Sequence, residues 1–381
     1  MTRTTQIART TGAALAVLLL VAACSSDGGA TTAPATDAPS TNASAPAATS
    51  AGGSGCDPKD IKLVQSGRGL ENEYYVSVDA GSKAFADSVG LLDNYQWIAS
   101  DGDSQKQLSQ ITSILAQSGA CTVLNVDPNE SAILPAILDA VVANNAWLTV
   151  QWNRPEGTSP QETGPNWVAF MSEDGFVQGH DTAKALFEAM GGTGGIVALQ
   201  GILDNTVAQS RFAGLQKALE EYPDIKLLGD QTAKWDRTEG QNVMQTFLTK
   251  FGDEITGVWA GNDAMGLGAV AANEAAGKKI PVSGIDGLEE SLKAIAAGDG
   301  KSGFIATTQA NAANQGGFGL AIAYAAATGE IDPTTEPDEH RAFFLKTNIV
   351  TKANVADIPA PDDTSKMDFS DIWSVVGAAI P

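Results

Sequence analysis

Two polar side chains, Asn262 and Asp263, follow the apolar run 257–260 after one glycine, and a segment of small residues typical of a helix begins after them. The apolar run 280–285 ends in the same way, with Asp286 and a glycine. In a parallel α/β sheet, ligands bind at the carboxyl ends of the strands. Carboxylate and amide groups at two such ends can accept from and donate to hydroxyl groups, which predicts a site for a polyhydroxylated ligand.

The elements that must position these side chains alternate along the chain. From Asp57 onward, apolar segments typical of strands alternate with amphipathic segments typical of helices, and this pattern indicates βαβ units and mostly parallel sheets. Roughly eleven strands are too many for one compact sheet of this kind, so we predict an α/β protein with two doubly wound parallel-sheet lobes. The expected strands are residues 61–65, 96–99, 122–126, 147–151, 167–171, 195–199, 225–228, 257–260, 280–285, 303–308 and 342–350.

The N-terminus has the pattern of an exported protein. Two arginines precede the apolar stretch 13–21, which is too short for a transmembrane helix, so residues 1–23 are predicted to be a signal peptide. The Val-Ala-Ala-Cys sequence that ends at Cys24 resembles the lipobox of bacterial lipoproteins, and this implies cleavage before Cys24 and its lipidation. Plain secretion is the alternative. Residues 24–55, rich in Ala, Ser, Thr, Gly and Pro, predict a disordered tether below a lipid anchor on the outer face of the bacterial cytoplasmic membrane.

Charge and composition exclude other classes of protein. The 381 residues include 23 Lys and Arg against 45 Asp and Glu, a formal net charge of −22, whereas a nucleic-acid-binding protein needs a basic face. His180 and His340 are the two histidines of the chain, so a Cys/His metal site has no ligand set. The spacing of Asp101 and Asp103 could begin a calcium loop, but the later ligands and the central glycine are missing, so a helix cap is predicted instead.

Cys56 and Cys121 precede the first and third expected strands. In a doubly wound sheet these strands are usually neighbours, so both sulfurs are expected at the same end of the sheet. Because an exported chain permits oxidation, a Cys56–Cys121 disulfide is predicted, with two free buried thiols as the alternative.

The alternation of elements, taken with the signal peptide, resembles the type I periplasmic (solute) binding proteins of sugar ABC transporters, in particular the ribose-binding group. The resemblance covers about residues 61–355. It implies a monomer without cofactor that closes two lobes around a small molecule and delivers it to an ABC permease. It also implies a hinge of three crossovers, near Ser172, Gln309 and Leu345.

This organisation gives the expected domain boundaries. Residues 56–171 and 309–345 form the first lobe, and residues 172–308 and 346–358 form the second. The remaining residues, 359–381, are a C-terminal tail that is expected to pack on its own domain. Four apolar side chains of this tail are spaced for one face of a helix: Phe369, Ile372, Trp373 and Val376.

Two motifs in the first lobe carry the resemblance. Asn72-Glu73-Tyr74-Tyr75-Val76-Ser77 is similar to the family's Asn-x-aromatic-aromatic motif, which implies that Asn72 binds a hydroxyl while Tyr74 and Tyr75 offer ring faces to a sugar. Gln151-Trp152-Asn153-Arg154 occupies the position of the family's Asp-Arg pair, so Asn153 and Arg154 are carried over as ligand residues. Because Asn153 replaces the aspartate, the resemblance does not extend to ribose itself as the ligand.

The second lobe contributes further positions that match the family's ligand residues. The Arg-x-x-Gly segment that begins at Arg211 and the Trp-Asp-Arg segment 235–237 resemble family motifs, with Trp235 as the opposing aromatic plate and the Asp-Arg pair as a helix cap. Asp263 is expected to have a structural role. The residues that the resemblance carries over as ligand-binding in this lobe and its hinge are Arg211, Trp235, Asn262, Asp286 and Gln309.

The predicted function is that of a carrier for a neutral monosaccharide or sugar alcohol, and other functions fit the sequence less well. Asp263 and Asp286 could form the acid pair of a glycoside hydrolase, but hydroxyl binding needs the same groups, and the chain has no Gly-x-Ser-x-Gly elbow. The lactose-repressor family shares the expected fold but carries a basic helix-turn-helix at its N-terminus, where this chain has its signal peptide. A lipoprotein that presents bound sugar to a membrane receptor is the alternative that the sequence leaves open.

Overall fold

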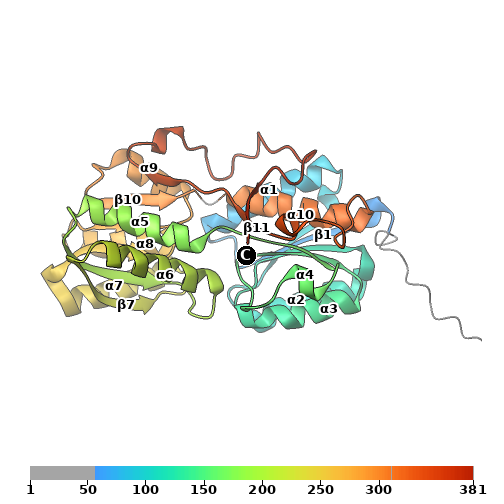
Figure 1. Cartoon of the computed structure of the whole chain (residues 1–381), viewed down its shortest axis with the longest axis horizontal. Helices are drawn as coiled ribbons and strands as arrows, with labels where there is room; N and C mark the ends of the chain where they lie inside the picture. The colour runs from blue at the N-terminus through green and yellow to red at the C-terminus, as the bar shows by residue number, and fades with distance from the viewer. Residues whose placement is uncertain (1–55, 310, 381) are drawn as a thin grey trace, which may run out of the picture. The chain divides into compact units, whose positions relative to one another are not determined.

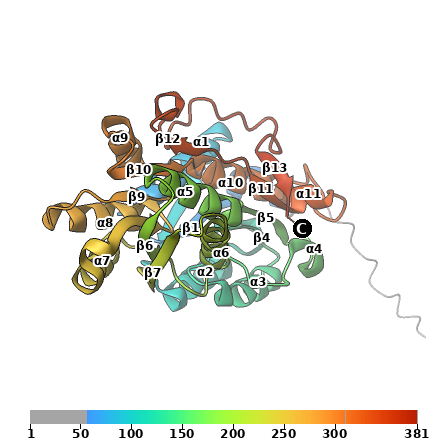
Figure 2. The same cartoon turned by 60° about the vertical axis from the view of Figure 1, so that its left-hand side comes forward.

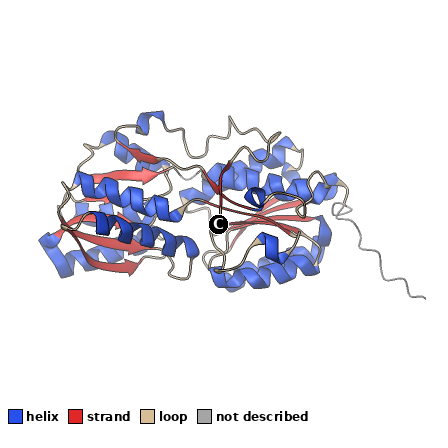
Figure 3. Ribbon diagram, viewed as in Figure 1, coloured by secondary structure: helices blue, strands red, loops and turns tan. Residues whose placement is uncertain are grey.

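The computed structural model describes residues 56–309 and 311–380, which form a seven-stranded and a six-stranded sheet, each with helices on both faces (Figure 3). The predicted class, two α/β lobes with doubly wound and mostly parallel sheets, is confirmed. Each sheet and its helices form one lobe.

The first sheet has the strand order β13-β11-β5-β4-β3-β1-β2, and its pairs are parallel except β11 with β13. Its strands are β1 (Lys62–Gly67), β2 (Tyr95–Ala99), β3 (Thr122–Val126), β4 (Trp147–Gln151), β5 (Trp167–Ser172), β11 (Ala342–Leu345) and β13 (Val376–Ala379). Its helices are α1 (Glu73–Ser88), α2 (Ser104–Ser118), α3 (Leu134–Ala143), α4 (Pro160–Thr163), α10 (Ala312–Thr328) and α11 (Asp338–Arg341).

The second sheet has the order β12-β10-β9-β8-β6-β7, parallel except for the pair of β10 with β12. Its strands are β6 (Gly194–Gln200), β7 (Ile225–Thr232), β8 (Ile255–Ala260), β9 (Pro281–Ser283), β10 (Gly303–Thr308) and β12 (Ile349–Thr351). Its helices are α5 (Gly175–Ala189), α6 (Thr206–Glu221), α7 (Arg237–Phe251), α8 (Asp263–Ala275) and α9 (Glu289–Ala297) (Figures 1 and 2).

Alternation along the strands explains why both faces of each sheet are covered. Successive side chains of a strand point to opposite faces. In β1, Leu63 packs in the cluster that holds α1 and α10, whereas Val64 packs in the cluster that holds α2 and α3. In β6, Val197 packs toward α7 and α8, and Ile196 toward α5 and α6. The buried strands are therefore apolar on both sides.

Polar residues in the middle of the first sheet hold α10 close to it. Asn125 donates to the carbonyl of Gln315 at 2.8 Å, Gln151 donates to the same carbonyl at 3.0 Å, and Thr149 donates to that of Gly319 at 2.8 Å. A Cβ atom at Gly319 would lie 2.1 Å from the amide of Asn125, so only glycine fits there. The helix that follows β10 is thus fixed to the first lobe, which makes the segment between them a connection between lobes.

The C-terminal residues correct one expectation. No helix forms at 359–380, because Asp363, Asp368 and Asp371 each accept a hydrogen bond from the backbone N–H two residues on, a turn geometry that competes with helix formation. The expected packing on the protein's own core is confirmed: Phe369 contacts Phe85 edge to face, with ring centroids 5.2 Å apart. The segment ends in β13, at the edge of the first sheet.

The chain also crosses between the sheets once more than expected. The three predicted crossings are present, between β5 and α5, between β10 and α10, and between β11 and β12. Because β12 belongs to the second sheet and β13 to the first, residues 352–375 form a fourth connection.

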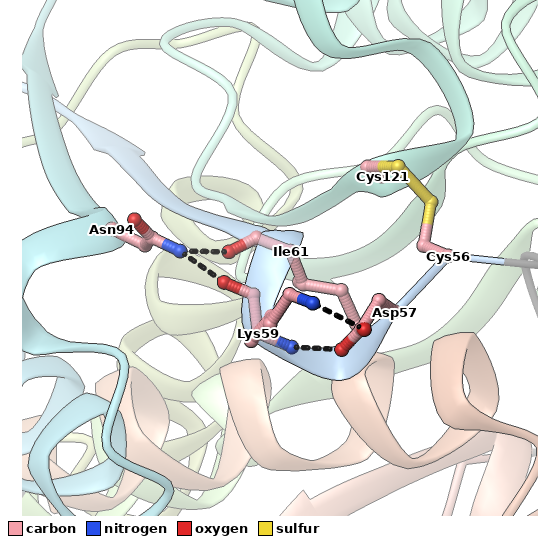
Figure 4. The surroundings of a disulfide bond; sticks show 6 residues. All are labelled: Cys56, Asp57, Lys59, Ile61, Asn94 and Cys121. Atoms are coloured by element: carbon pink, nitrogen blue, oxygen red, sulfur yellow. Dashed lines mark hydrogen bonds and ion pairs between the residues drawn. A yellow bond between two sulfur atoms is a disulfide. The ribbon is translucent and has the colours of Figure 1, made fainter.

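The predicted disulfide joins Cys56 to Cys121, whose Cα atoms are 5.5 Å apart (Figure 4). Strands β1 and β3 are neighbours, as the prediction required. Beside the disulfide, the side-chain amide of Asn94 donates to the carbonyls of Lys59 at 2.8 Å and Ile61 at 3.2 Å, which fixes the segment that leads into β1.

The predicted signal peptide, the lipidated Cys24 and the tether lie outside the described residues. Among residues 56–309 and 311–380, no helix combines the length and apolar character needed to cross a membrane. Within those same ranges, no cluster of His, Cys, Asp and Glu side chains suits a metal ion.

Candidate functional site

Side chains from the carboxyl ends of both sheets line one cavity between the lobes. Eight of the residues predicted from the sequence lie in its wall: Asn72, Tyr74, Tyr75, Asn153, Arg211, Trp235, Asn262 and Asp286. The other lining residues are Arg68, Asp127, Pro128, Asn129, Trp152, Asn205 and Val207. The structure therefore brings together residues that are more than two hundred positions apart in the sequence, as with Arg68 and Asp286.

The two predicted asparagines also serve as helix caps. Asn72 caps α1, and its side-chain oxygen accepts from the backbone N–H of Tyr74 at 3.0 Å. Asn262 caps α8 in the same way, accepting from Met265 at 3.0 Å. Each oxygen is used to satisfy a free N–H of the first turn, which leaves the side-chain NH2 group for a ligand. The NH2 group of Asn262 also donates to the carbonyl of Trp235 at 3.4 Å, so one of its two hydrogens remains.

Asp127, which follows β3, organises the wall from the first lobe. Its carboxylate accepts from the Tyr75 hydroxyl at 2.8 Å and from the Asn153 amide at 3.0 Å. Burial raises the pKa of Asp127 to about 6, and these two hydrogen bonds together with the charge of Arg68 oppose the increase. An aspartate at position 153 would bring a second carboxylate against Asp127, and like charges at this distance disfavour ionisation. The asparagine that departs from the family's pattern is thus explained by its neighbour.

Aromatic side chains from both lobes form the apolar part of the wall. The Trp152 indole donates to the Tyr74 hydroxyl at 2.6 Å, and the rings of Tyr74 and Tyr75 meet edge to face with centroids 5.1 Å apart. Trp235 comes from the second lobe. Trp152 and Trp235 have φ angles of 60° and 66°, in the left-handed region. Such strained residues concentrate at functional sites, and ring faces of this kind suit the weakly apolar C–H faces of sugars and polyols.

Arg211 lies between the two indoles and beside the acid of the second lobe. Its guanidinium carbon is 5.0 Å from the ring centre of Trp152 and 5.6 Å from that of Trp235. It donates to the carbonyl of Gly261 at 2.8 Å and contacts a carboxylate oxygen of Asp286 at 3.5 Å. Arg211 is only 3% exposed, so its geometry is fixed by these contacts.

Asp286 is buried and its backbone is strained, with φ at 125°. Burial raises the pKa of Asp286 to about 8 even though Arg211 lowers it, and the charges of Asp263 and Asp127 add to the increase. A buried carboxyl group that is costly to ionise gains most from additional hydrogen-bond donors. Hydroxyl groups of a ligand would supply such donors to Asp286.

Four buried polar atoms in the cavity wall have no hydrogen-bond partner among the described residues. Two are donors, on the side chains of Arg68 and Asn129, and two are the acceptor oxygens of Asn153 and Asn205. Buried polar groups are normally paired. Hydroxyl groups both donate and accept, so a molecule with several hydroxyls matches this mixed set.

Two predicted ligand residues do not lie in this wall. The Arg154 guanidinium stacks on the ring of Phe170, 4.5 Å from its centre, and donates to the carbonyl of Thr158. The left-handed turn at Trp152 directs Asn153 into the cavity and Arg154 away from it. Gln309 lines a separate hollow, on the side of the C-terminal segment, which Asp286 also lines.

Five other wall residues were not among those predicted to bind the ligand: Arg68, Asp127, Asn129, Trp152 and Asn205. Arg68, Asp127 and Trp152 directly follow strands β1, β3 and β4, and Asn205 directly precedes α6. The signal that identified Asp286, a polar residue at the carboxyl end of an expected strand, applies equally to Asp127.

Asp263 has the structural role that was predicted. Its carboxylate accepts from the backbone N–H of Leu288 at 2.9 Å, from the Thr307 hydroxyl at 2.7 Å and from the Ser291 hydroxyl. Burial raises the pKa of Asp263 to about 6, which the hydrogen bonds oppose. The predicted helix caps Asp103 and Asp236 are also confirmed, for α2 and α7.

The lobes touch each other at the rim of the cavity. The Ser131 and Thr206 hydroxyls are 3.2 Å apart, and the backbone N–H of Ala132 donates to Asp204 at 3.2 Å. Arg68 donates to the carbonyl of Lys234 at 3.4 Å. Two doubly wound lobes that meet around a buried polar and aromatic cavity define a two-lobed α/β ligand-binding protein.

Comparison with known proteins gives the family. Residues 65–331 match the model of the periplasmic binding protein domain. The xylitol-binding protein of Mycolicibacterium smegmatis is 34% identical over 254 residues, covering 66% of this chain and 69% of that protein. The ribose import binding protein of Salmonella typhimurium is 30% identical over 264 residues, covering 68% and 83%.

A solved structure agrees with these relatives. The crystal structure of a twin-arginine translocation pathway signal protein from Burkholderia phytofirmans has a TM-score of 0.81 and 38% identity, covering 84% of this chain and 98% of that one. The chain belongs to the periplasmic binding protein domain family. It is an exported binding protein and not an enzyme.

Proposed function

We propose that the protein is the substrate-binding component of an ABC importer. It captures a neutral monosaccharide or sugar alcohol by hinge closure and delivers it to a membrane permease. The observation that carries this proposal is the cavity walled by both lobes, with aromatic faces, paired acids and arginines, and unpartnered donors and acceptors. The names of the xylitol- and ribose-binding relatives support the same class of ligand.

The charges of the wall favour a neutral ligand. Two arginines, Arg68 and Arg211, face two acids, Asp127 and Asp286. A sugar acid would place its carboxylate near Asp286, and a cationic ligand would meet Arg211. Hydroxyl groups avoid both conflicts because they donate to carboxylates and accept from guanidinium groups.

The proposed contacts follow from the available groups. Asp286 accepts from hydroxyls, Arg211 donates to them, and the side-chain amides of Asn72, Asn153 and Asn262 bind the remaining ones. The rings of Tyr74, Tyr75 and Trp235 cover the C–H faces, and Trp152 adds a further ring. Because these groups belong to two lobes, a ligand binds the closed arrangement better than the open one and shifts the population toward it.

The remaining proposals concern the location and the partner. Lipidation of Cys24 and a tether at 24–55 would hold a monomer on the outer face of the cytoplasmic membrane. A receptor that reads the closed lobes is the alternative partner to a permease, and the neighbouring genes would distinguish them.

The function is tested by measuring thermal stability and then calorimetric affinity of residues 56–381 with xylitol, other pentitols, tetritols, ribose, allose, myo-inositol and sugar acids. A true ligand raises the melting temperature because it binds only the folded state. We expect one neutral polyol or sugar to bind with the largest shift. A folded protein that responds to none of them would refute the proposed ligand class.

A further inference from the structure

We propose that Gln178 is a positioning residue that connects Arg211 to two of the crossovers between the lobes, with Glu173 as its anchor. The proposal rests on the proposed function, because Arg211 is one of the residues assigned to the ligand. It goes beyond that function by identifying which side chains outside the cavity wall make the site depend on the geometry of the hinge.

Gln178 lies in the first turns of α5 and is completely buried. Its side-chain NH2 donates to the Glu173 carboxylate and, at 3.1 Å, to the hydroxyl of Thr308. Its oxygen accepts from Nε of Arg211 at 3.2 Å. One amide group therefore uses both its donor and its acceptor capacity, which a carboxylate or an apolar side chain of similar size cannot do.

The two residues that receive hydrogen bonds from Gln178 belong to different crossovers. Glu173 lies between β5 and α5, and Thr308 is the last residue of β10, before the chain returns to the first lobe at α10. In hinge closure the residues between rigid elements absorb the change in backbone angles. Glu173 lies within one crossover, and Thr308 directly precedes another. A change of backbone angles that reaches either residue alters a hydrogen bond of Gln178, and through it the position of Arg211.

Arg211 links the position of Gln178 to the cavity wall. Its remaining contacts are Asp286, the carbonyl of Gly261 and the indoles of Trp152 and Trp235. Trp152 belongs to the first lobe and Trp235 to the second. The position of Arg211 therefore depends on the arrangement of the crossovers and of both lobes. The hydrogen bond from Arg211 to Gln178 thus contributes to the closed site as well as to the packing of α5.

The anchor is a buried acid with its own response to pH. Glu173 is 1% exposed and faces Gln178, Arg211, Asp286 and the backbone N–H of Asn311. Burial raises the pKa of Glu173 well above its usual value, the charge of Asp286 adds to this, and Arg211 opposes it. A raised pKa means that the buried arrangement is favoured while the carboxyl is neutral and becomes less favourable as pH rises.

The test compares Gln178→Met, which keeps the volume and removes all three hydrogen bonds, with Gln65→Met. Gln65 is an equally buried, hydrogen-bonded glutamine in the core of the first lobe, so it controls for the loss of a buried amide. Two quantities are measured on residues 56–381: the affinity for xylitol, ribose and myo-inositol as probes, and the distance distribution between spin labels at the exposed positions Ser113 and Gln245 without ligand. These labels lie on α2 and α7, in different lobes.

We expect Gln178→Met to weaken binding of the bound probe at least about tenfold, the loss of a charged hydrogen bond, and to broaden the unliganded distance distribution. Gln65→Met should change neither. Thr308→Val removes one hydrogen bond with little change in shape, so it should weaken binding and broaden the distribution to a smaller extent. It replaces Gln178→Met as the test if that variant does not fold. Wild-type affinity and an unchanged distribution in folded Gln178→Met and Thr308→Val would overturn the proposal.

The anchor is tested by pH. Glu173→Gln should lose less affinity than the wild type as pH rises, because the amide that replaces the buried carboxyl beside Gln178 cannot ionise. Identical pH profiles would overturn the role of Glu173. If the wild type binds no probe, the proposed function fails, and the distance distributions still decide whether Gln178 holds the crossovers.

Discussion

Asp286 is the side chain on which the proposed site depends most, and Asp286→Asn tests it with almost no change in shape. The carboxylate contacts Arg211 through one oxygen at 3.5 Å, which leaves lone pairs on both oxygens for ligand hydroxyls. Asparagine keeps one acceptor and loses the charge. We therefore expect the variant to fold and to lose affinity.

The magnitude follows from the hydrogen bonds. The variant loses one charged hydrogen bond, worth about 1.5–3 kcal/mol, and reduces another to a neutral one at a cost of about 1 kcal/mol. The total of about 2.5–4 kcal/mol corresponds to a Kd that is about 10²- to 10³-fold higher. The free energy of unfolding without ligand should not fall, because the pKa of Asp286 is raised to about 8 and its ionised form is the one that burial disfavours.

The sign of the pH dependence gives a second measurement. An acid whose pKa is raised in the folded state contributes stability below its unfolded pKa, near 4, and that stability is lost as pH rises to about 8. The free energy of unfolding of Asp286→Asn, measured with urea at several pH values, should therefore fall less across this window than that of the wild type.

The matched control is Asp263→Asn. The Asp263 carboxylate accepts three hydrogen bonds inside the second lobe, and an amide leaves at least one donor unpaired at a cost of about 1–3 kcal/mol of stability. Calorimetry and urea denaturation on both variants separate the roles of the two acids. Wild-type affinity in folded Asp286→Asn would refute the assignment of Asp286 and the reasoning from its environment.

Four other substitutions probe three separate parts of the structure. Arg154→Ala should alter the Kd by less than about twofold, whereas Arg211→Ala should raise it at least about a hundredfold; calorimetry that finds equal losses would contradict the orientation of these arginines. Asn153→Asp should weaken binding at neutral pH and recover part of the affinity at pH 5, because the new carboxylate lies against Asp127 and both cannot ionise freely; a flat affinity profile would count against that pairing. Cys121→Ser should lower the free energy of unfolding by about 4 kcal/mol, the loop-entropy value for a disulfide that spans 65 residues, and an unchanged urea midpoint would show that the bridge contributes no stability.

Several features could be predicted from local sequence because local physics decides them. Apolar runs alternating with amphipathic runs give βαβ units, and a polar residue after such a run lies at the carboxyl end of a strand. These patterns were sufficient to predict the two lobes, the position of Asn262 and Asp286 at strand ends, and the pairing of Cys56 with Cys121. The tail was mispredicted because its apolar spacing fits a helix, whereas the side chains of Asp363, Asp368 and Asp371 stabilise turns instead.

The arrangement of the site could not be read from spacing, because it depends on which groups meet across strands and lobes. Asn153 and Arg154 are adjacent in the sequence, yet the backbone conformation at Trp152 places one in the cavity and the other on Phe170. The role of Asp127 in the cavity wall is visible only in the folded sheet, where its carboxylate accepts hydrogen bonds from Tyr75 and Asn153.

The sequence by itself determined the class of fold, the disulfide and eight side chains of the cavity wall, since residue type and spacing decide which elements form and which polar groups follow each strand. The tertiary structure decided the rest: the direction of Arg154, the fourth connection between lobes, and the link from Glu173 through Gln178 to Arg211. These depend on contacts between segments far apart in the chain, and the burial that raises the pKa of Asp286 exists only once those segments have packed.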